Sequence, residues 1–100
     1  MLILATLTYP ATSVMAMGKA AVESLKREVP HVNRLSVQVT YGGDGLKAYN
    51  LYELEKGYED EASRTLFENF VPFYNIDGFK LNLEMVLPVA EALPMIRLSL

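Results

Sequence analysis

The chain has 100 residues, of which 51% are hydrophobic and 21% are charged, and its formal net charge is −3. This length is typical of a single domain that buries roughly 65% of its unfolded surface. The charges are spread along the chain without a basic patch for phosphate backbones, so nucleic acid is not an expected partner. The absence of cysteine excludes disulfides, thiolate catalysis and Cys-ligated metals. It also fits the cytoplasmic location that we expect.

Residues 1–7 are apolar, which raises the question of a signal peptide or a membrane span. A signal peptide begins with positive charge, whereas the first basic residue here is Lys19. The apolar run is also too short to cross a bilayer. We therefore predict no membrane association, and a buried first strand over residues 2–8 that ends at Tyr9-Pro10.

A helix is predicted after Pro10, with Thr12 or Ser13 as its cap and Pro30 as its stop. Its basic and acidic residues lie mostly on the side opposite an apolar stripe. The stripe consists of Val14, Gly18, Ala21, Val22, Leu25 and Val29. Small residues at positions 18 and 21 predict a close approach of this helix to a sheet.

Residues 34–41 and 46–54 are rich in β-branched and aromatic side chains, and Gly42-Gly43-Asp44-Gly45 separates them. Glycine reaches positive φ without a Cβ clash, so this pattern predicts a β-hairpin with its turn at residues 42–45. A phosphate cradle would need a helix directly after the glycines. Because a strand follows instead, we interpret the cluster as a turn.

A second helix is predicted over residues 58–70, with an i, i+4 stripe of Tyr58, Ala62, Leu66 and Phe70. Pro72 ends it, and an aromatic connector over residues 71–78 leads to a last strand over residues 79–87. That strand alternates between apolar and polar side chains. Residues 89–93 predict a short helix, and the tail over residues 96–100 is either an edge strand or a segment that docks on a partner.

The predicted class is α+β. The order strand, helix, strand, strand, helix, strand predicts a ferredoxin-like βαββαβ fold as one domain over residues 1–100. It has a four-stranded antiparallel sheet, two main helices on one face and a short C-terminal helix. The predicted second face of the sheet carries Ser36, Gln38, Thr40, Lys80, Asn82 and Glu84, with Thr6 and Thr8. Uncharged polar groups dominate this set, which indicates partial burial with satisfied hydrogen bonds.

These features together resemble the dimeric α/β-barrel superfamily, and in particular its short, uncharacterised bacterial and archaeal members. The resemblance rests on the element order, the length, the Tyr9-Pro10 exit, the Gly-rich hairpin and the connector Phe73-Tyr74-Asn75-Ile76-Asp77-Gly78-Phe79. It implies a homodimer in which two sheets face each other to form a barrel, so that the partner is a second copy of the chain. Members of the superfamily include cofactor-independent monooxygenases, lactone isomerases, haem enzymes and ligand-sensing domains. Fold alone does not choose among these functions.

The single histidine, His31, follows Pro30 at the exit of the first helix. We interpret it as a solvated loop residue rather than a catalytic base or a haem ligand. With one histidine and no cysteine, a metal would need a carboxylate site. Glu59, Asp60 and Glu61 are adjacent on a helix and point in different directions, which is typical of surface charge at a helix start. We expect neither a metal nor a cofactor.

Tyrosine combines apolar area with one hydroxyl, which suits a pocket for a small, partly aromatic ligand. The predicted ligand-binding residues are Tyr9, Tyr41, Tyr49, Asn50, Tyr52 and Tyr74. Tyr49 and Tyr52 have opposite parity on one strand, whereas Asn50 shares the parity of Tyr52. The alternative is that these tyrosines only pack, since strands and interfaces are rich in tyrosine.

Three functions are consistent with the sequence. The first is a small homodimeric domain that binds an apolar or aromatic ligand in a tyrosine-lined pocket. The second is a cofactor-independent monooxygenase- or isomerase-like enzyme that acts on a small aromatic or polyketide-like substrate. The third is a purely structural dimerisation module. We rank the binding domain first.

Overall fold

The computed structural model describes residues 1–42 and 45–100. The strands and the two main helices follow the predicted order. The elements are β1 (Leu2–Tyr9), η1 (Ala11–Ser13), α1 (Val14–Lys26), β2 (Val32–Gly42), β3 (Gly45–Leu54), α2 (Glu59–Phe70), η2 (Val71–Asn75), β4 (Lys80–Val86), α3 (Val89–Ala92) and η3 (Leu93–Ile96). None of the helices in the described ranges is long and apolar enough to cross a membrane.

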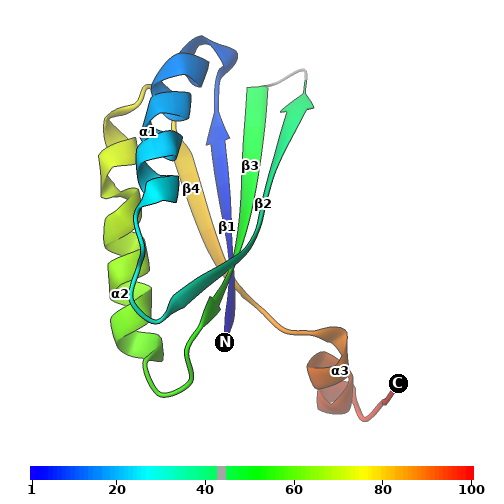
Figure 1. The fold of residues 1–100 in the computed structure, drawn as a ribbon. Helices are drawn as coiled ribbons and strands as arrows, with labels where there is room; N and C mark the ends of the chain where they lie inside the picture. The colour runs from blue at the N-terminus through cyan, green and yellow to red at the C-terminus, as the bar shows by residue number, and fades with distance from the viewer. Residues whose placement is uncertain (43–44) are drawn as a thin grey trace.

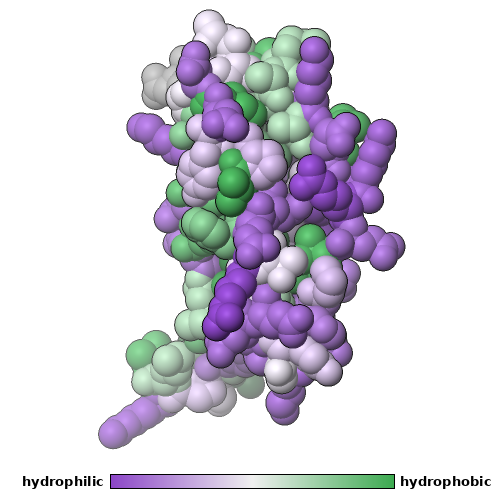
Figure 2. All heavy atoms as spheres, turned by 90° about the vertical axis from the view of Figure 1, so that its left-hand side faces the viewer, coloured by the Kyte–Doolittle hydropathy of each residue, from purple (hydrophilic) through white to green (hydrophobic). Residues whose placement is uncertain are grey.

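The four strands form one antiparallel sheet in the order β2-β3-β1-β4. Both main helices, α1 and α2, lie on one face of this sheet, and the other face is uncovered (Figure 1). The outer surface of the helix layer carries mostly hydrophilic side chains, with small scattered groups of hydrophobic ones (Figure 2). The α+β class and the four-stranded antiparallel sheet predicted from the sequence are therefore confirmed.

Register assigns each strand residue to a face, because directly paired residues on neighbouring strands point to the same side. On the uncovered face, Thr6 pairs with both Tyr49 and Asn82, and Tyr49 pairs in turn with Gln38. The same register places the whole predicted polar set on this face, as expected. Within the set, Asn82 donates a hydrogen bond to Glu84 at 2.9 Å, and Gln38 donates one to Ser36 at 3.3 Å.

A β-bulge interrupts β2 at Leu35. Arg34 pairs with Tyr52, and the next pair joins Ser36 to Leu51, so Leu35 has no partner across the ladder. The extra residue reverses the alternation of side chains at this point. Arg34 consequently points to the helix side, although simple alternation would place it with Ser36 and Gln38 on the uncovered face.

The core lies between α2 and the centre of the sheet. Ala62, Leu66 and Phe70 of α2 are buried, which confirms most of the predicted stripe. The fourth member, Tyr58, is partly exposed. The ring of Phe70 meets the ring of Tyr52 edge-on, with centroids 6.3 Å apart.

Packing of α1 differs from the prediction. Met17 and Ser24 are its buried residues, whereas Val14, Val22 and Leu25 of the predicted stripe are exposed. A Cβ added at Gly18 would meet no atom within 4 Å, so the predicted close approach at this position is wrong. The helix stands away from the hairpin half of the sheet, and this separation leaves a gap between them.

The ends of α1 also differ from the prediction. The helix stops at Lys26, before Pro30. Neither predicted cap residue acts as a side-chain cap: a 3-10 turn over Ala11–Ser13 comes first, and the Ser13 hydroxyl makes no cap bond. That hydroxyl instead donates to the carbonyl oxygen of Asp77 at 2.7 Å, because the connector after α2 lies beside the helix start.

The predicted turn at residues 42–45 falls partly on positions 43–44, outside the residues that the structure describes. At its far side Gly45 has φ of 128°, and a Cβ there would lie 2.8 Å from the carbonyl oxygen of Tyr9. A side chain at this position would therefore collide with the end of β1, which explains the glycine.

The C-terminal segment leaves the end of β4 and extends away from the helix layer (Figure 1). Its short helix α3 follows Pro88, as predicted, but residues 97–100 form no strand. The edge-strand alternative for the tail is thus not realised within one chain. The apolar side chains of this segment are exposed: they are Leu87, Val89, Met95, Ile96, Leu98 and Leu100.

Candidate functional site

The gap beside α1 is an apolar cleft of about 290 Å³ between this helix and the β2–β3 hairpin. Met17, Ala21 and Leu25 line it from the helix. Val37 and Val39 of β2 line it from the sheet and stay exposed, because neither helix covers this edge. The cleft therefore exists because the sheet is wider than the helix layer that packs on it.

The floor of the cleft is part of the buried core. Tyr52, Phe70 and Phe73 line it, and all three belong to the buried core. Phe70 and Phe73 have ring centroids 6.0 Å apart. The buried hydrogen bond from Asn69 to the Ser24 hydroxyl, at 3.0 Å, ties α2 to α1 beneath the cleft. Because core residues are closely packed, this floor is already formed in the absence of a ligand.

A few polar groups reach the cleft among these apolar walls. Tyr9, Tyr41 and Tyr52 contribute hydroxyls, and Asn50 contributes an amide. Asn50 is buried, yet its side chain forms no hydrogen bond to any other part of the described chain. Its amide is thus available to a ligand. Tyr41, 82% exposed, stands at the rim.

The structure brings together four of the six predicted site residues: Tyr9, Tyr41, Asn50 and Tyr52. The predicted parity is confirmed, because Asn50 and Tyr52 face the helices while Tyr49 faces the other side of the sheet. Tyr74 lies away from the cleft on η2. Its ring meets Phe79 edge-on, with centroids 5.4 Å apart.

Arg34 also lines the cleft, although it is not among the predicted site residues. Its guanidinium carbon lies 5.5 Å from the centre of the Tyr52 ring, a cation–π arrangement. The bulge at Leu35 brings it there. The sequence held one sign of this role, which is that Arg34 is a basic residue in a strand otherwise rich in valine. Simple alternation of side chains, however, would have assigned Arg34 to the uncovered face.

The pKa values of two cleft tyrosines are raised. Burial raises the pKa of Tyr52, and the neighbouring guanidinium of Arg34 partly offsets this. Burial also raises the pKa of Tyr9, and the neighbouring Tyr41 adds to the effect. Both hydroxyls are therefore protonated at neutral pH, which leaves each with a proton that it can donate in a hydrogen bond.

The raised pKa of Tyr52 makes the folded state sensitive to alkali. Above the ordinary tyrosine pKa of 10.0, the unfolded chain loses this proton before the folded protein does. The unfolded state then binds fewer protons, so the free energy of unfolding falls as the pH rises past about 10. Urea unfolding at pH 9 to 11 is expected to show this fall. In Tyr52→Phe the free energy of unfolding should decrease less steeply with pH than in the wild type. Tyr74→Phe is the control, and equal slopes in wild type and Tyr52→Phe would contradict the expectation.

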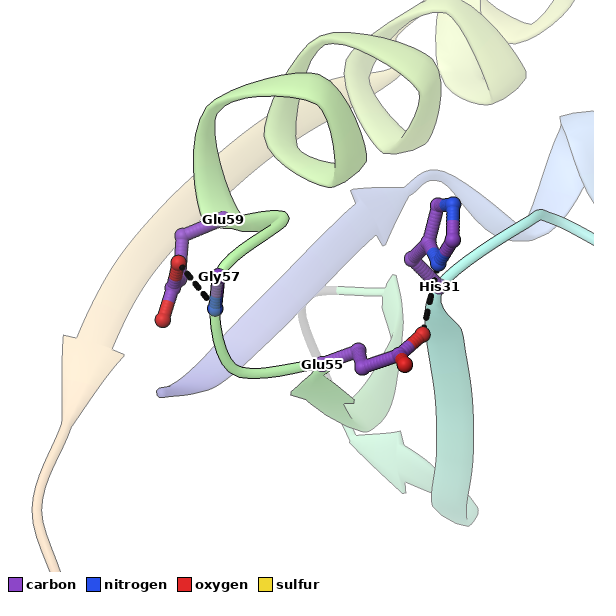
Figure 3. Close-up of polar contacts among 4 residues, drawn as sticks. All are labelled: His31, Glu55, Gly57 and Glu59. Carbon is purple, nitrogen blue, oxygen red and sulfur yellow. Dashed lines mark hydrogen bonds and ion pairs between the residues drawn. The ribbon is translucent and has the colours of Figure 1, made fainter.

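His31 lies outside the cleft, in the turn before β2, and it is more strongly held than a solvated loop residue. Its Nδ1 donates to Oε2 of Glu55 at 2.6 Å (Figure 3). Its ring stacks on Tyr58 with centroids 3.8 Å apart. At the same corner Oε2 of Glu59 accepts a hydrogen bond from the amide of Gly57 at 2.9 Å (Figure 3). These contacts join the ends of β2 and β3 to the start of α2, which is a structural role.

Across residues 1–42 and 45–100, no three His, Cys, Asp or Glu side chains form a group that could hold a metal ion. The acidic residues of the first turn of α2 are Glu59, Asp60 and Glu61. They stand at the positive end of the helix dipole.

Comparisons with known proteins identify no family. No family model matches the chain, and no curated protein matches it. Among solved structures, the chain is similar to the de novo designed protein Foldit4, with 14% identity and a TM-score of 0.44. That match covers 87% of this chain and 100% of the designed one. At this identity and TM-score the similarity says nothing about function.

Proposed function

We propose that the protein binds a small, largely apolar molecule in the cleft between α1 and the β2–β3 hairpin. The observation that carries this proposal is a cleft of about 290 Å³ with apolar walls, bordered by Tyr9, Tyr41, Tyr52 and Asn50. Apolar surface with a few convergent polar groups is the usual composition of a small-molecule site. A ligand would cover Val37 and Val39, and removing apolar surface from water stabilises the complex by roughly 25 cal/mol per Å².

The chemistry of the cleft favours binding over catalysis. Its lining residues include no histidine, aspartate or glutamate within the described chain. The hydroxyls of Tyr9 and Tyr52 keep their protons at neutral pH, since burial raises the pKa of both above the ordinary value of 10.0. A protonated tyrosine orients a ligand but abstracts no proton. The enzymatic alternative therefore has less support than the binding function.

We further propose that the fold is ferredoxin-like and that two copies associate through their uncovered sheet faces as a dimeric α/β barrel. The centre of this face carries Leu4, Leu51 and Tyr49, all partly exposed in the single chain. Facing sheets pack about 10 Å apart with their side chains interdigitated. Covering these residues would complete a second core on the side of the sheet that the helices leave open.

The charges on the uncovered face suit a two-fold dimer. Lys47 and Lys80 both pair with Thr8, at one end of β1. Glu53 and Glu84 pair with Leu2 and Leu4, toward the other end. A two-fold axis perpendicular to the strands would place the lysines of one copy over the glutamates of the other. Such self-complementary charge favours one relative orientation of the two sheets.

The ligand-binding proposal can be tested with the neutral fluorescent probe N-phenyl-1-naphthylamine. Its emission is expected to rise in the presence of the wild-type protein. Ala48→Phe, which puts a ring into the cleft from β3, is expected to lower the probe's affinity at least about tenfold, because the ring occupies the space of the probe. The measurement is a fluorescence titration, with circular dichroism to show that the variant is folded.

Ala16→Phe is the matched control, because Ala16 lies exposed on α1 and does not line the cleft. It is expected to keep wild-type affinity. Absence of any binding by the wild-type protein, or equal affinity in wild type and Ala48→Phe, would overturn the proposal. Native mass spectrometry of the purified protein adds a readout for any ligand retained from the cell.

A further inference from the structure

We propose that the ligand of the cleft is a monoanionic carboxylate with an apolar body, and that Arg34 binds its carboxylate group. The inference rests on the proposed binding function and adds the chemical class of the ligand. It follows from the position of one cation in a cleft whose other described lining residues carry no charge.

Arg34 is held in the cleft without an anionic partner. Its Nε atom is buried and forms no hydrogen bond within the described chain. The ion pair that the described residues form is His31–Glu55, so no carboxylate among them neutralises Arg34. A buried donor without a partner is less stable than one that is hydrogen-bonded, because it has lost water without gaining an acceptor. A ligand atom that accepts from this nitrogen would remove that penalty.

The surroundings hold the guanidinium in place for such a ligand. Pairing with Tyr52 on the helix side fixes the backbone of Arg34, and the guanidinium carbon lies 5.5 Å from the Tyr52 ring centre. Arg34 also lines an adjoining hollow together with Arg27 and Glu28, so this residue lies between the apolar cleft and a more polar surface. A carboxylate at this boundary leaves the rest of the ligand among apolar walls.

The number and type of charges select a carboxylate. Arg34 is the only charged residue among those that line the cleft, and no acidic residue of the described chain lines it. One guanidinium compensates one negative charge, whereas a phosphate dianion would keep an uncompensated charge in an apolar site. The planar fork of arginine matches the two oxygens of a carboxylate. The free amide of Asn50 can donate a further hydrogen bond.

The test compares two probes of nearly equal shape, 2-naphthoate and the neutral 2-naphthamide, by displacement of N-phenyl-1-naphthylamine at pH 7. The wild-type protein is expected to bind naphthoate at least about tenfold more tightly than naphthamide. Arg34→Met is expected to weaken naphthoate binding about 10-fold to 100-fold, because charge-assisted hydrogen bonds are lost. Its affinity for the neutral probe is expected to stay within about threefold.

Arg34→Lys keeps the charge and removes the fork, so it is expected to bind naphthoate with intermediate affinity. It also keeps the test decisive if Arg34→Met does not fold. Equal affinity of the wild type for naphthoate and naphthamide, with the neutral probe still bound, would overturn the carboxylate assignment alone. Failure of all three compounds to bind would overturn the proposed cleft function as well.

Discussion

A lysine at position 51 is expected to leave the protein monomeric. Leu51 lies on the uncovered sheet face, where Leu4 and Ser36 pair with it from the two neighbouring strands. In the proposed dimer this position is covered, and an unpaired charge in a buried interface costs about 3–5 kcal/mol. A two-fold dimer contains the substitution twice, so we expect the dissociation constant to rise by at least about four orders of magnitude.

The measurement is sedimentation equilibrium or light scattering at micromolar concentration. Wild type is expected at twice the 11.2 kDa subunit mass, and Leu51→Lys at the subunit mass. Val71→Lys is the control, because Val71 is a half-exposed apolar residue at the start of η2, outside the sheet. It should stay dimeric. A wild-type protein that is monomeric at these concentrations would eliminate the proposed sheet-face dimer.

Replacing Phe70 with alanine is expected to lower the free energy of unfolding by about 3–5 kcal/mol. The Phe70 side chain is only 2% exposed, and its ring packs against Tyr52 and Phe73 with centroids 6.3 and 6.0 Å away. The substitution removes both contacts and leaves a cavity in the floor of the cleft. A loss of this size is a large part of the 5–15 kcal/mol typical of a domain.

Urea unfolding at one fixed protein concentration measures this effect, because dimerisation would make apparent stability depend on concentration. Phe67→Ala is the matched control: it is the same substitution on the same helix, at a position 49% exposed. We expect it to change the free energy of unfolding by less than about 1 kcal/mol. Equal losses in the two variants would show that Phe70 is not at the centre of the core.

Local patterns in the sequence were sufficient for the strands and for α2. The alternation of β4 correctly separates Lys80, Asn82 and Glu84 from the apolar side, because strand periodicity is a property of the backbone alone. The i, i+4 stripe of α2 correctly predicts three buried residues, Ala62, Leu66 and Phe70. On α2 pattern and packing agree, because its stripe packs against one face of the sheet. On β4 the alternation fixes the faces only, since Leu83 and Met85 of its apolar side stay exposed.

The same reasoning failed for α1, and the failure is informative about the site. An apolar stripe identifies the side of a helix that avoids water, but it does not reveal how far away the neighbouring sheet lies. Here the sheet is wider than its helix layer, so Leu25 of the stripe lines an open cleft instead of a packed interface. Residues of the stripe for which close packing was predicted therefore line the candidate site instead.

By itself, the sequence determined the element order, the antiparallel hairpin, the polar second face and the opposite faces of Tyr49 and Tyr52. These depend on periodicity and turn chemistry, which act within a few residues. Tertiary structure alone decided the separation of α1 from the hairpin and the bulge at Leu35. Both depend on how distant segments fit together. The bulge directs Arg34 into the cleft. The proposal of a carboxylate ligand rests on the positive charge of this residue.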